Sequence, residues 1–352
     1  MKKIFLAIML LATFIFAGCN TQAAVDKEVR AGNDDLKIYM LNVRHGDAFL
    51  VRTKEQTILI DTGLLTEQNL LVKELERLSV TKIDKLILTH PHSDHIGNSG
   101  SLIKPSEKFL AQNPYLAKIS VGEVFDNGVT YTNSYYRRYM KLVKALKIPR
   151  RSLKVGDVLD FGGGVEFKVL FPTSEIVAEK NRLQALKQEE TDENSENDGK
   201  GDREFWMNNT SLVAKLTYKD FSMMFTGDCE KESEAKILAA NNAKDLKCDI
   251  LKAGHHGVRN ASSKDFVAAV NPTFVLISTN NKFDEGNYRG TPHRAALENY
   301  LAQGVKAENI LCTKWNGTVT VTTDGKNFSV TPEKTADWVE NWLAKKRELG
   351  VK

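Results

Sequence analysis

The chain has 352 residues, 41% of them hydrophobic, which is enough to bury a full core as one large domain or two small ones. Its formal net charge of +4 is too small to indicate a class of partner. Beyond Cys19 the cysteines are odd in number and widely spaced, which excludes a disulfide framework and a zinc finger and favours buried free thiols: Cys229, Cys248 and Cys312.

The N-terminus has the features of an export signal. Two lysines precede an apolar run over residues 4–16, which ends in Ala17-Gly18-Cys19. A basic start, an apolar run of this length and small residues at its end predict a signal peptide over residues 1–19. The run is too short to favour a membrane-spanning helix.

The end of this signal resembles a bacterial lipobox, in which Cys19 becomes the lipidated first residue of the mature chain. Phe16 departs from that pattern, since Leu, Val or Ile is usual there. The alternative is an ordinary secretory signal cut near Ala23-Ala24. Either signal predicts an exported protein, anchored by lipid on the outer side of the cytoplasmic membrane or secreted, with residues 20–35 as a polar tether.

The elements that follow are typical of an α/β protein. Three segments rich in β-branched and apolar residues predict strands: 36–43, 48–52 and 57–60. Residues 64–78 carry leucines at helical spacing, and residues 83–88 predict a strand that runs directly into the first histidine cluster. Strand, helix, strand and loop in this order place a functional site at strand ends.

Residues 131–154 combine tyrosines with arginines and lysines and predict a basic helix followed by a loop. Such a helix is suited to hold a phosphodiester chain and stack its bases. The alternative is a solvated helix face with the tyrosines packed beneath it. Residues 175–188 predict a further helix, and an acidic insertion at about 187–204 is expected to be a mobile loop, either a lid over the site or a plain surface insertion.

The C-terminal half repeats the pattern of strands that lead into polar residues. A hairpin over 212–226 leads to Gly227-Asp228, a strand over 250–253 leads to the pair His255-His256, and a strand over 274–278 leads toward His293. A second hairpin, between turn signals at 316–317 and 324–325, and a helix over 333–347 close the chain. The strand-rich segments 36–90 and 212–330 are interpreted as two halves of one sandwich.

Histidine is the most informative residue type here. The seven histidines occupy four places: His45, the cluster His90-His92-His95, the pair His255-His256, and His293. Neutral imidazole and carboxylate are ligands that borderline first-row metals prefer. His90 and His92 lie two apart at a strand end, so both can face one ion, while Asp94 and His95 follow on the turn and are placed to hold a second.

Asp228 is suited to bridge two cations, and His256 or His255 would complete the shell of the second ion. Two such ions form a clamp that provides hydroxide at neutral pH and neutralises charge on an attacked ester or phosphate. The chain contains neither a G-x-G-x-x-G nor a G-x-x-x-x-G-K-[ST] motif. The sequence therefore predicts a metal-dependent hydrolase.

These residues resemble a known family. Residues 89–97 contain the H-x-H-x-D-H signature of the metallo-β-lactamase superfamily, and further motifs resemble, in order, those of ComEC-like competence proteins. Residues 42–48, N-V-R-H-G-D-A, are similar to the family's D-V-G-Q-G-D-A, and residues 287–293, N-Y-R-G-T-P-H, are similar to its N-x-Y-G-H-P-H. The family's N-x-S-L-V, G-D and L-K-x-x-H-H-G patterns occur at 209–213, 227–228 and 251–257. The resemblance covers about residues 36–330.

The resemblance implies a four-layer αβ/βα sandwich over residues 36–350, with a site for two divalent ions, Zn²⁺ or Mn²⁺, along one edge. It assigns as ligands His90, His92, Asp94, His95, Asp228 and one of His255 and His256, of which we favour His256. The expected catalytic residues are Asp94, His255 as an acid or phosphate contact, and His293 as a donor to the leaving oxygen or simply a helix cap. The expected substrate contacts are His45, Asn209 and Ser211.

Two departures from the family bear on the site. His45 replaces a glutamine and Thr291 replaces a histidine, so the rim that meets substrate differs. No histidine lies between His95 and His255, so the usual third ligand of the first ion in the wider superfamily is missing. That ion is therefore expected to be weakly held or exchangeable.

The resemblance implies a phosphodiesterase or nuclease, with single-stranded nucleic acid as a candidate substrate and no protein partner. A hydrolase of other esters is the alternative: a choline-phosphate esterase, a lactonase or a β-lactamase. A surface binding lipoprotein with a relic site is a third interpretation, which the complete set of ligand residues argues against.

Overall fold

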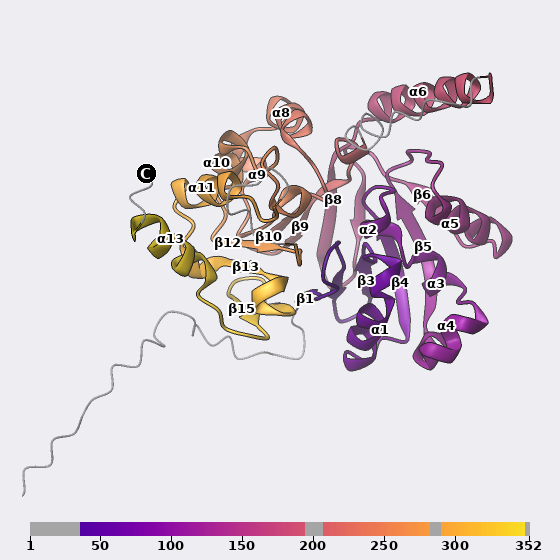
Figure 1. Cartoon of the computed structure of the whole chain (residues 1–352), viewed down its shortest axis with the longest axis horizontal. Coiled ribbons are helices and arrows are strands. Elements are labelled where there is room, and N and C mark those ends of the chain that lie inside the picture. Colours follow the sequence, from indigo (N-terminus) through magenta and orange to yellow (C-terminus); the bar gives the residue numbers. More distant parts are fainter. Residues whose placement is uncertain (1–35, 194–206, 282–289, 349–352) are drawn as a thin grey trace, which may run out of the picture.

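Two β-sheets lie face to face, and each carries helices on its outer surface (Figure 1). The computed structural model describes residues 36–193, 207–281 and 290–348. Within these ranges, no helix has the length and apolar character needed to cross a membrane. The sheets pair parallel strands with antiparallel ones, as in many α/β folds.

Several sequence predictions lie outside the described residues. These are the signal peptide 1–19 with Cys19, the tether 20–35, and residues 194–204 of the acidic insertion. They remain predictions.

The first sheet has eight strands, in the order β15-β14-β1-β2-β3-β4-β5-β6. Strands β1 to β3 form an antiparallel meander, and β3 to β6 run parallel. The strands are β1 (Leu36–Met40), β2 (Phe49–Arg52), β3 (Thr57–Ile60), β4 (Lys82–Leu88), β5 (Ser120–Asp126), β6 (Arg150–Ser152), β14 (Val319–Thr323) and β15 (Phe328–Pro332).

The second sheet has seven strands, in the order β13-β12-β11-β10-β9-β8-β7. Strands β10 to β13 run parallel, while β7 to β10 pair antiparallel, including the predicted hairpin of β9 with β10. The strands are β7 (Val158–Asp160), β8 (Val165–Phe171), β9 (Val213–Tyr218), β10 (Phe221–Phe225), β11 (Ile250–Lys252), β12 (Phe274–Ile277) and β13 (Ile310–Cys312).

Helices cover the outer face of each sheet. Those associated with the first sheet are η1 (Leu65–Glu67), α1 (Gln68–Arg77), α2 (Ser93–Ile96), α3 (Ser99–Ile103), α4 (Glu107–Gln112), η2 (Pro114–Lys118) and α5 (Ser134–Ala145). The later helices are α6 (Ser174–Glu193), α8 (Lys231–Ala240), α9 (Ala243–Leu246), η3 (Gly254–Gly257), α10 (Lys264–Val270), α11 (Arg294–Ala302), η4 (Ala307–Asn309), α12 (Thr313–Asn316) and α13 (Trp338–Glu348).

Three apolar clusters account for the layers. The central cluster joins the inner faces of both sheets, with Phe49 of β2 and Phe167 of β8 each meeting Phe225 of β10. A second cluster packs α1, α3 and α5 onto the first sheet, and a third packs α8, α10, α11 and α13 onto the second. The predicted four-layer αβ/βα sandwich is confirmed, because the two sheets pack on each other and helices bury the outer face of each.

The division into two sequence halves was wrong in detail. The hairpin β14-β15 pairs with β1 of the first sheet, and β7 and β8 belong to the second. Each sheet therefore contains strands from both the N-terminal and the C-terminal part of the chain. Helix α6 also runs to Glu193, past the predicted end at Gln188 and into the segment expected to be a loop.

The basic segment is anchored by its tyrosines and one arginine. Tyr136 and Tyr139 are buried beneath α5, whereas the basic side chains of that helix are exposed. Arg150 lies in β6 and is paired with the buried Asp126 of β5 at 2.5 and 2.8 Å, and the Tyr139 hydroxyl donates to the same carboxylate at 2.8 Å. The tyrosines therefore pack as the alternative interpretation expected, and Arg150 is part of the fold.

Replacing that carboxylate tests its structural role. Asp126→Asn would weaken a charge-assisted network and lower the free energy of unfolding by about 3 kcal/mol. The control Glu123→Gln removes an exposed carboxylate from the same strand and should change it by less than about 0.5 kcal/mol. Urea denaturation of both variants gives the two values, and equal effects would contradict the assignment.

Candidate metal centre

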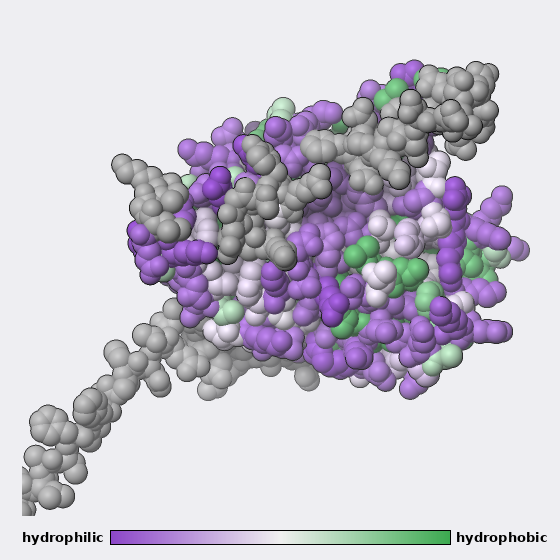
Figure 2. All heavy atoms as spheres, in the orientation of Figure 1, coloured by the Kyte–Doolittle hydropathy of each residue, from purple (hydrophilic) through white to green (hydrophobic). Residues whose placement is uncertain are grey.

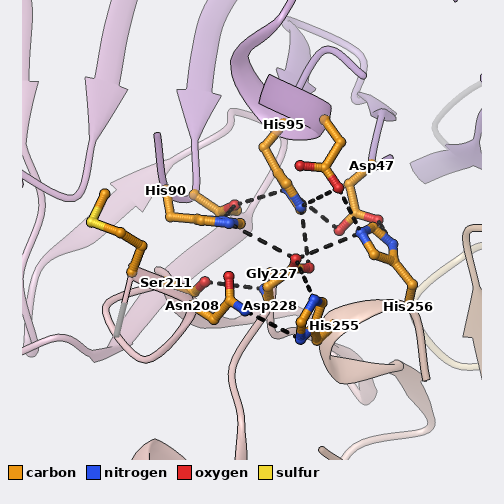
Figure 3. Close-up of polar contacts among 12 residues, drawn as sticks. Asp47, His90, His95, Asn208, Ser211, Gly227, Asp228, His255 and His256 are labelled. Atoms are coloured by element: carbon orange, nitrogen blue, oxygen red, sulfur yellow. Dashed lines mark hydrogen bonds and ion pairs between the residues drawn. The ribbon is translucent and has the colours of Figure 1, made fainter. Parts of the chain in front are cut away.

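Three loops at strand ends bring the predicted ligands together (Figure 3). β4 of the first sheet leads into residues 89–95, while β10 and β11 of the second sheet lead into Gly227-Asp228 and into η3. The backbone N–H of Leu212 donates to Thr89 O at 2.9 Å, which fixes the two sheets to each other at this edge. The ligands thus come from both halves of the sandwich.

The side chains form two sets that share Asp228. His90, His92 and Asp228 make up one set, and Asp94, His95, Asp228 and His256 make up the other. Within each set the ligand atoms lie within 4.8 Å of one another. Asp228 Oδ2 is 3.8 Å from His90 Nε2 and 3.6 Å from His256 Nε2, and Oδ1 is 3.1 Å from His95 Nε2.

The buried polar atoms of this site indicate that it is built for cations. In the described structure His90 Nε2 and His92 Nε2 are buried without a hydrogen-bond partner. Buried polar groups are nearly always hydrogen-bonded, and exceptions are explained by an ion or by function. Imidazole nitrogens and carboxylates fit Zn²⁺ and Mn²⁺, so the residues present fit two divalent ions.

The histidines are oriented through their other ring nitrogen. His95 Nδ1 lies 2.7 Å from Asp61 Oδ2, and His256 Nδ1 lies 2.8 Å from the carbonyl oxygen of Ser278. A metal-bound histidine almost always has its second nitrogen held in this way, which fixes the tautomer and aims the free nitrogen. Asp61 was not identified as a site residue from the sequence.

A buried lysine supports the second set from behind. Lys252 is 1% exposed, and its Nζ lies 2.7 Å from Asp47 Oδ2 and 2.9 Å from Gly227 O. Asp47 is itself 3.4 Å from His256 Nδ1 and accepts a hydrogen bond from Ser278 Oγ. Lys252 therefore neutralises a buried carboxylate and holds the turn that carries Asp228. The sequence interpretation missed both Lys252 and Asp47, although both lie inside motifs it had singled out.

Two glycines permit the close packing of these loops. Gly227 has φ +49°, and a Cβ there would lie 3.0 Å from side-chain atoms of Ser211 and Thr89. Gly46 has φ +106°, and a Cβ there would lie 2.3 Å from the carbonyl oxygen of Asp94. Only glycine combines such a backbone with such contacts.

The residues predicted to meet substrate lie in different environments. His45 is at the rim, with Nε2 3.4 Å from Asp94 Oδ2 and its side chain 31% exposed. Ser211 is fully buried, and its Oγ accepts a hydrogen bond from the backbone N–H of Asp228 at 3.0 Å. The observed contact of Ser211 therefore positions the predicted metal ligand Asp228, whereas a contact with substrate stays a prediction.

Asn209 and His293 are engaged at helix starts. The Asn209 amide contacts Ser233 and Glu232, near the start of α8. His293 is buried, and its Nδ1 accepts a hydrogen bond from the backbone N–H of Ala295 at 3.0 Å, so it caps α11. The cap confirms one of the two interpretations of His293, while its role as a proton donor stays a prediction.

The two histidine pairs differ in protonation. Burial, together with the neighbouring His95, holds the pKa of His90 well below its usual value, and burial also lowers the pKa of His92. For His95 and His256 burial acts in the same direction, but nearby carboxylates, Asp228 first, outweigh it. The pKa of His95 is raised well above its usual value and that of His256 to about 10.

Binding of the second ion should therefore release protons. Without metal, His256 is protonated at pH 8, because its pKa is raised to about 10, whereas a ligand nitrogen must be unprotonated. The pKa of His95 is raised as well, by the carboxylates around it. Apparent affinity should rise with pH until these groups are neutral. Calorimetry at pH 8 in two buffers of different ionisation enthalpy should show at least about one proton released per second-site ion. A heat that does not depend on the buffer would contradict this.

Comparison with known proteins identifies the family. Residues 41–278 match the metallo-beta-lactamase superfamily. ComE operon protein 3 of Bacillus subtilis (strain 168) is 25% identical over 80% of this chain and 32% of its own length. Competence protein ComA of Neisseria gonorrhoeae is 23% identical over 85% of this chain and 33% of its own length. The chain thus spans about a third of the length of these curated relatives, and the predicted resemblance to competence proteins is confirmed.

Solved structures with similar chain paths include an isothiocyanate hydrolase from Delia radicum gut bacteria, at 14% identity and a TM-score of 0.41 over 81% of this chain and 97% of that one. A diphosphatase of the PhnP family has 11% identity and a TM-score of 0.39 over 82% of this chain and 98% of that one. Because the family match covers more than half of the chain, this protein belongs to the metallo-beta-lactamase superfamily and is a hydrolase of that family.

Proposed function

We propose that this protein is an exported, metal-dependent phosphodiesterase that cleaves nucleic acid, single-stranded DNA being the first substrate to test. The observation that carries the proposal is Asp228, one carboxylate shared by two sets of histidines beside a basic helix. The two-set arrangement suits a bond whose attacked centre carries several oxygens, as a phosphodiester does.

The chain's own residues have distinct proposed roles. His90, His92 and Asp228 would hold the first ion, and Asp94, His95, Asp228 and His256 the second. When bound, Zn²⁺ or Mn²⁺ would supply Lewis-acid charge and a water of lowered pKa.

Residues around the ligands would bind substrate and move protons. His45 stands at the exposed rim, where it would contact substrate, and burial with the nearby His256 lowers its pKa to about 4, so it is neutral at physiological pH. His293, whose Nδ1 accepts a backbone hydrogen bond, would donate a proton from its other ring nitrogen to the leaving oxygen. Asn209, in the loop before β9, would contact the substrate.

The preference for a polyanion rests on α5. The side-chain amide of Asn133, its N-cap, donates to the carbonyl oxygen of Pro91 at 2.9 Å, and the ring of Tyr131 lies 6.2 Å from that of His92. The helix therefore starts beside the first ligand set. Its exposed basic side chains are Arg137, Arg138, Lys141 and Lys144, and they would guide a phosphate backbone toward the site.

Export is proposed from the N-terminal sequence alone. The signal over residues 1–19 and the cysteine Cys19 would place the mature enzyme in the cell envelope on a lipid anchor. Labelling of cells with a radioactive fatty acid would detect the anchor, and a Cys19→Ala variant should remain unlabelled.

A substrate panel tests the proposed activity. Protein loaded with Zn²⁺ or Mn²⁺ should hydrolyse bis(p-nitrophenyl) phosphate and single-stranded DNA, and a chelator should abolish both reactions. His92→Ala should lower kcat/KM for each at least about 100-fold, because it removes a predicted ligand. Turnover of nitrocefin, a lactone or a choline phosphate instead of these substrates would favour the other ester hydrolases. Unchanged metal content and activity in His92→Ala would favour a relic site.

The charge on α5 should affect only the polymeric substrate. The triple change Arg137→Gln, Lys141→Gln, Lys144→Gln should raise KM for single-stranded DNA roughly tenfold and flatten its salt dependence. Hydrolysis of bis(p-nitrophenyl) phosphate should be unaffected, since that molecule is too small to reach along the helix. The control Lys306→Gln, Lys326→Gln, Lys334→Gln removes the same charge from other exposed positions. Equal effects of the two triple changes would contradict a guiding role for α5.

A further inference from the structure

We infer that His255 is the third nitrogen ligand of the first ion, so that His90, His92, His255 and Asp228 form its complete shell. The inference rests on the metal-dependent function proposed above and deepens it. It replaces the role of proton donor or phosphate contact that the sequence suggested for His255.

The first ligand set is one member short. The second set has four ligand residues, the usual number for zinc, whereas the first has three within 4.8 Å of one another. The chain has no histidine between His95 and His255 to supply the missing one. A nitrogen close to Asp228, on a residue outside both sets, is the natural candidate.

Distances to the shared carboxylate match those of the other ligands. His255 Nε2 lies 3.7 Å from Asp228 Oδ2, compared with 3.8 Å for His90 Nε2 and 3.6 Å for His256 Nε2. Two atoms that bind one tetrahedral ion at about 2.0–2.1 Å lie roughly 3.4 Å apart. Measured to Asp228, His255 is placed as well as either of the other two histidines (Figure 3). It lies outside the group of atoms from His90, His92 and Asp228 that are within 4.8 Å of one another, so its ring would turn toward them when the ion binds.

His255 also has the support that marks metal-bound histidines. Its Nδ1 lies 2.7 Å from Glu230 Oε1, a carboxylate with 0% exposure, and Asn208 Nδ2 donates to the same oxygen at 3.1 Å. The Asp61–His95 contact has the same 2.7 Å length. When Nδ1–H donates to Glu230, Nε2 is left as a lone pair, which is the state a metal ligand requires.

The backbone of η3 supports the assignment. His255 and His256 are consecutive residues with positive φ, 43° and 55°. Such conformations cost a non-glycine residue about 1–3 kcal/mol each and persist at functional sites. Here the two conformations bring both imidazoles to Asp228. If only one of the two histidines were a ligand, a glycine could take the other position without this cost.

Metal counting on the folded protein tests the inference. At a buffered free zinc concentration that saturates the wild type with two ions, His255→Ala should retain about one, because only the four-residue second set stays intact. Substituted Co²⁺ gives an independent readout, and the variant should lose the visible absorption of one tetrahedral ion. Circular dichroism and thermal unfolding of the metal-free proteins show whether the variant folds.

A second variant keeps the test informative if His255→Ala does not fold. Glu230→Gln should weaken the affinity of the first ion about 10- to 100-fold while the second ion is held as before. Glu232→Gln is the matched control, because its exposed carboxylate contacts Asn209 and no ligand. It should bind both ions as the wild type does.

Two results would overturn the inference: folded His255→Ala that keeps both ions at wild-type affinity, or Glu230→Gln that binds both as tightly as Glu232→Gln. If phosphodiester is cleaved but His255→Ala keeps both ions, the inference fails and the proposed function stands. If no phosphodiester is cleaved but the count falls from two to one, the ligand assignment stands and the proposed function fails.

Discussion

The buried carboxylate of Asp228 is the group on which the site depends. It is 1% exposed and lies within 4 Å of the Nε2 atoms of four histidines: His90, His95, His255 and His256. Its place is fixed by the hydrogen bond from its backbone N–H to Ser211 and by the turn at Gly227, which Lys252 holds. Because His90 and His95 follow a strand of the first sheet while Asp228 follows a strand of the second, the sandwich must close before either ligand set exists.

The charges of the site explain why so much polar surface is buried here. A buried carboxylate is costly unless a cation compensates it. Lys252 compensates Asp47 permanently, whereas His95 and His256 compensate Asp94 and Asp228 only while they are protonated. Divalent ions would take the place of those protons. The same negative centre that retains metal therefore retains protons in its absence, which links metal affinity to pH.

Much of the site could be predicted from the sequence because most of its ligands lie close together along the chain. His90, His92, Asp94 and His95 occur within one loop, and the apolar segment before them marks the strand end that positions them. The supporting residues could not be identified in this way. Asp61 reaches His95 across 34 positions, and Ser278 reaches Asp47 across 231. Such contacts follow from how strands pair, which spacing alone does not reveal.

The fold shows the same limit. The central strands β3 and β4 have apolar runs that predict them well, but β6 and β7 are three residues long and carry charged side chains, so their pattern is weak. The assignment of β14 and β15 to the first sheet depends on pairing with β1, more than 270 positions away. Local preference favours a hairpin there, and tertiary packing decides which sheet it joins.

The most direct test of the central claim is anomalous diffraction from crystals of the zinc-loaded protein, collected on both sides of the zinc absorption edge. The account predicts two anomalous peaks roughly 3.5–4 Å apart, with Asp228 between them. A single peak, or two peaks that do not share Asp228, would contradict it.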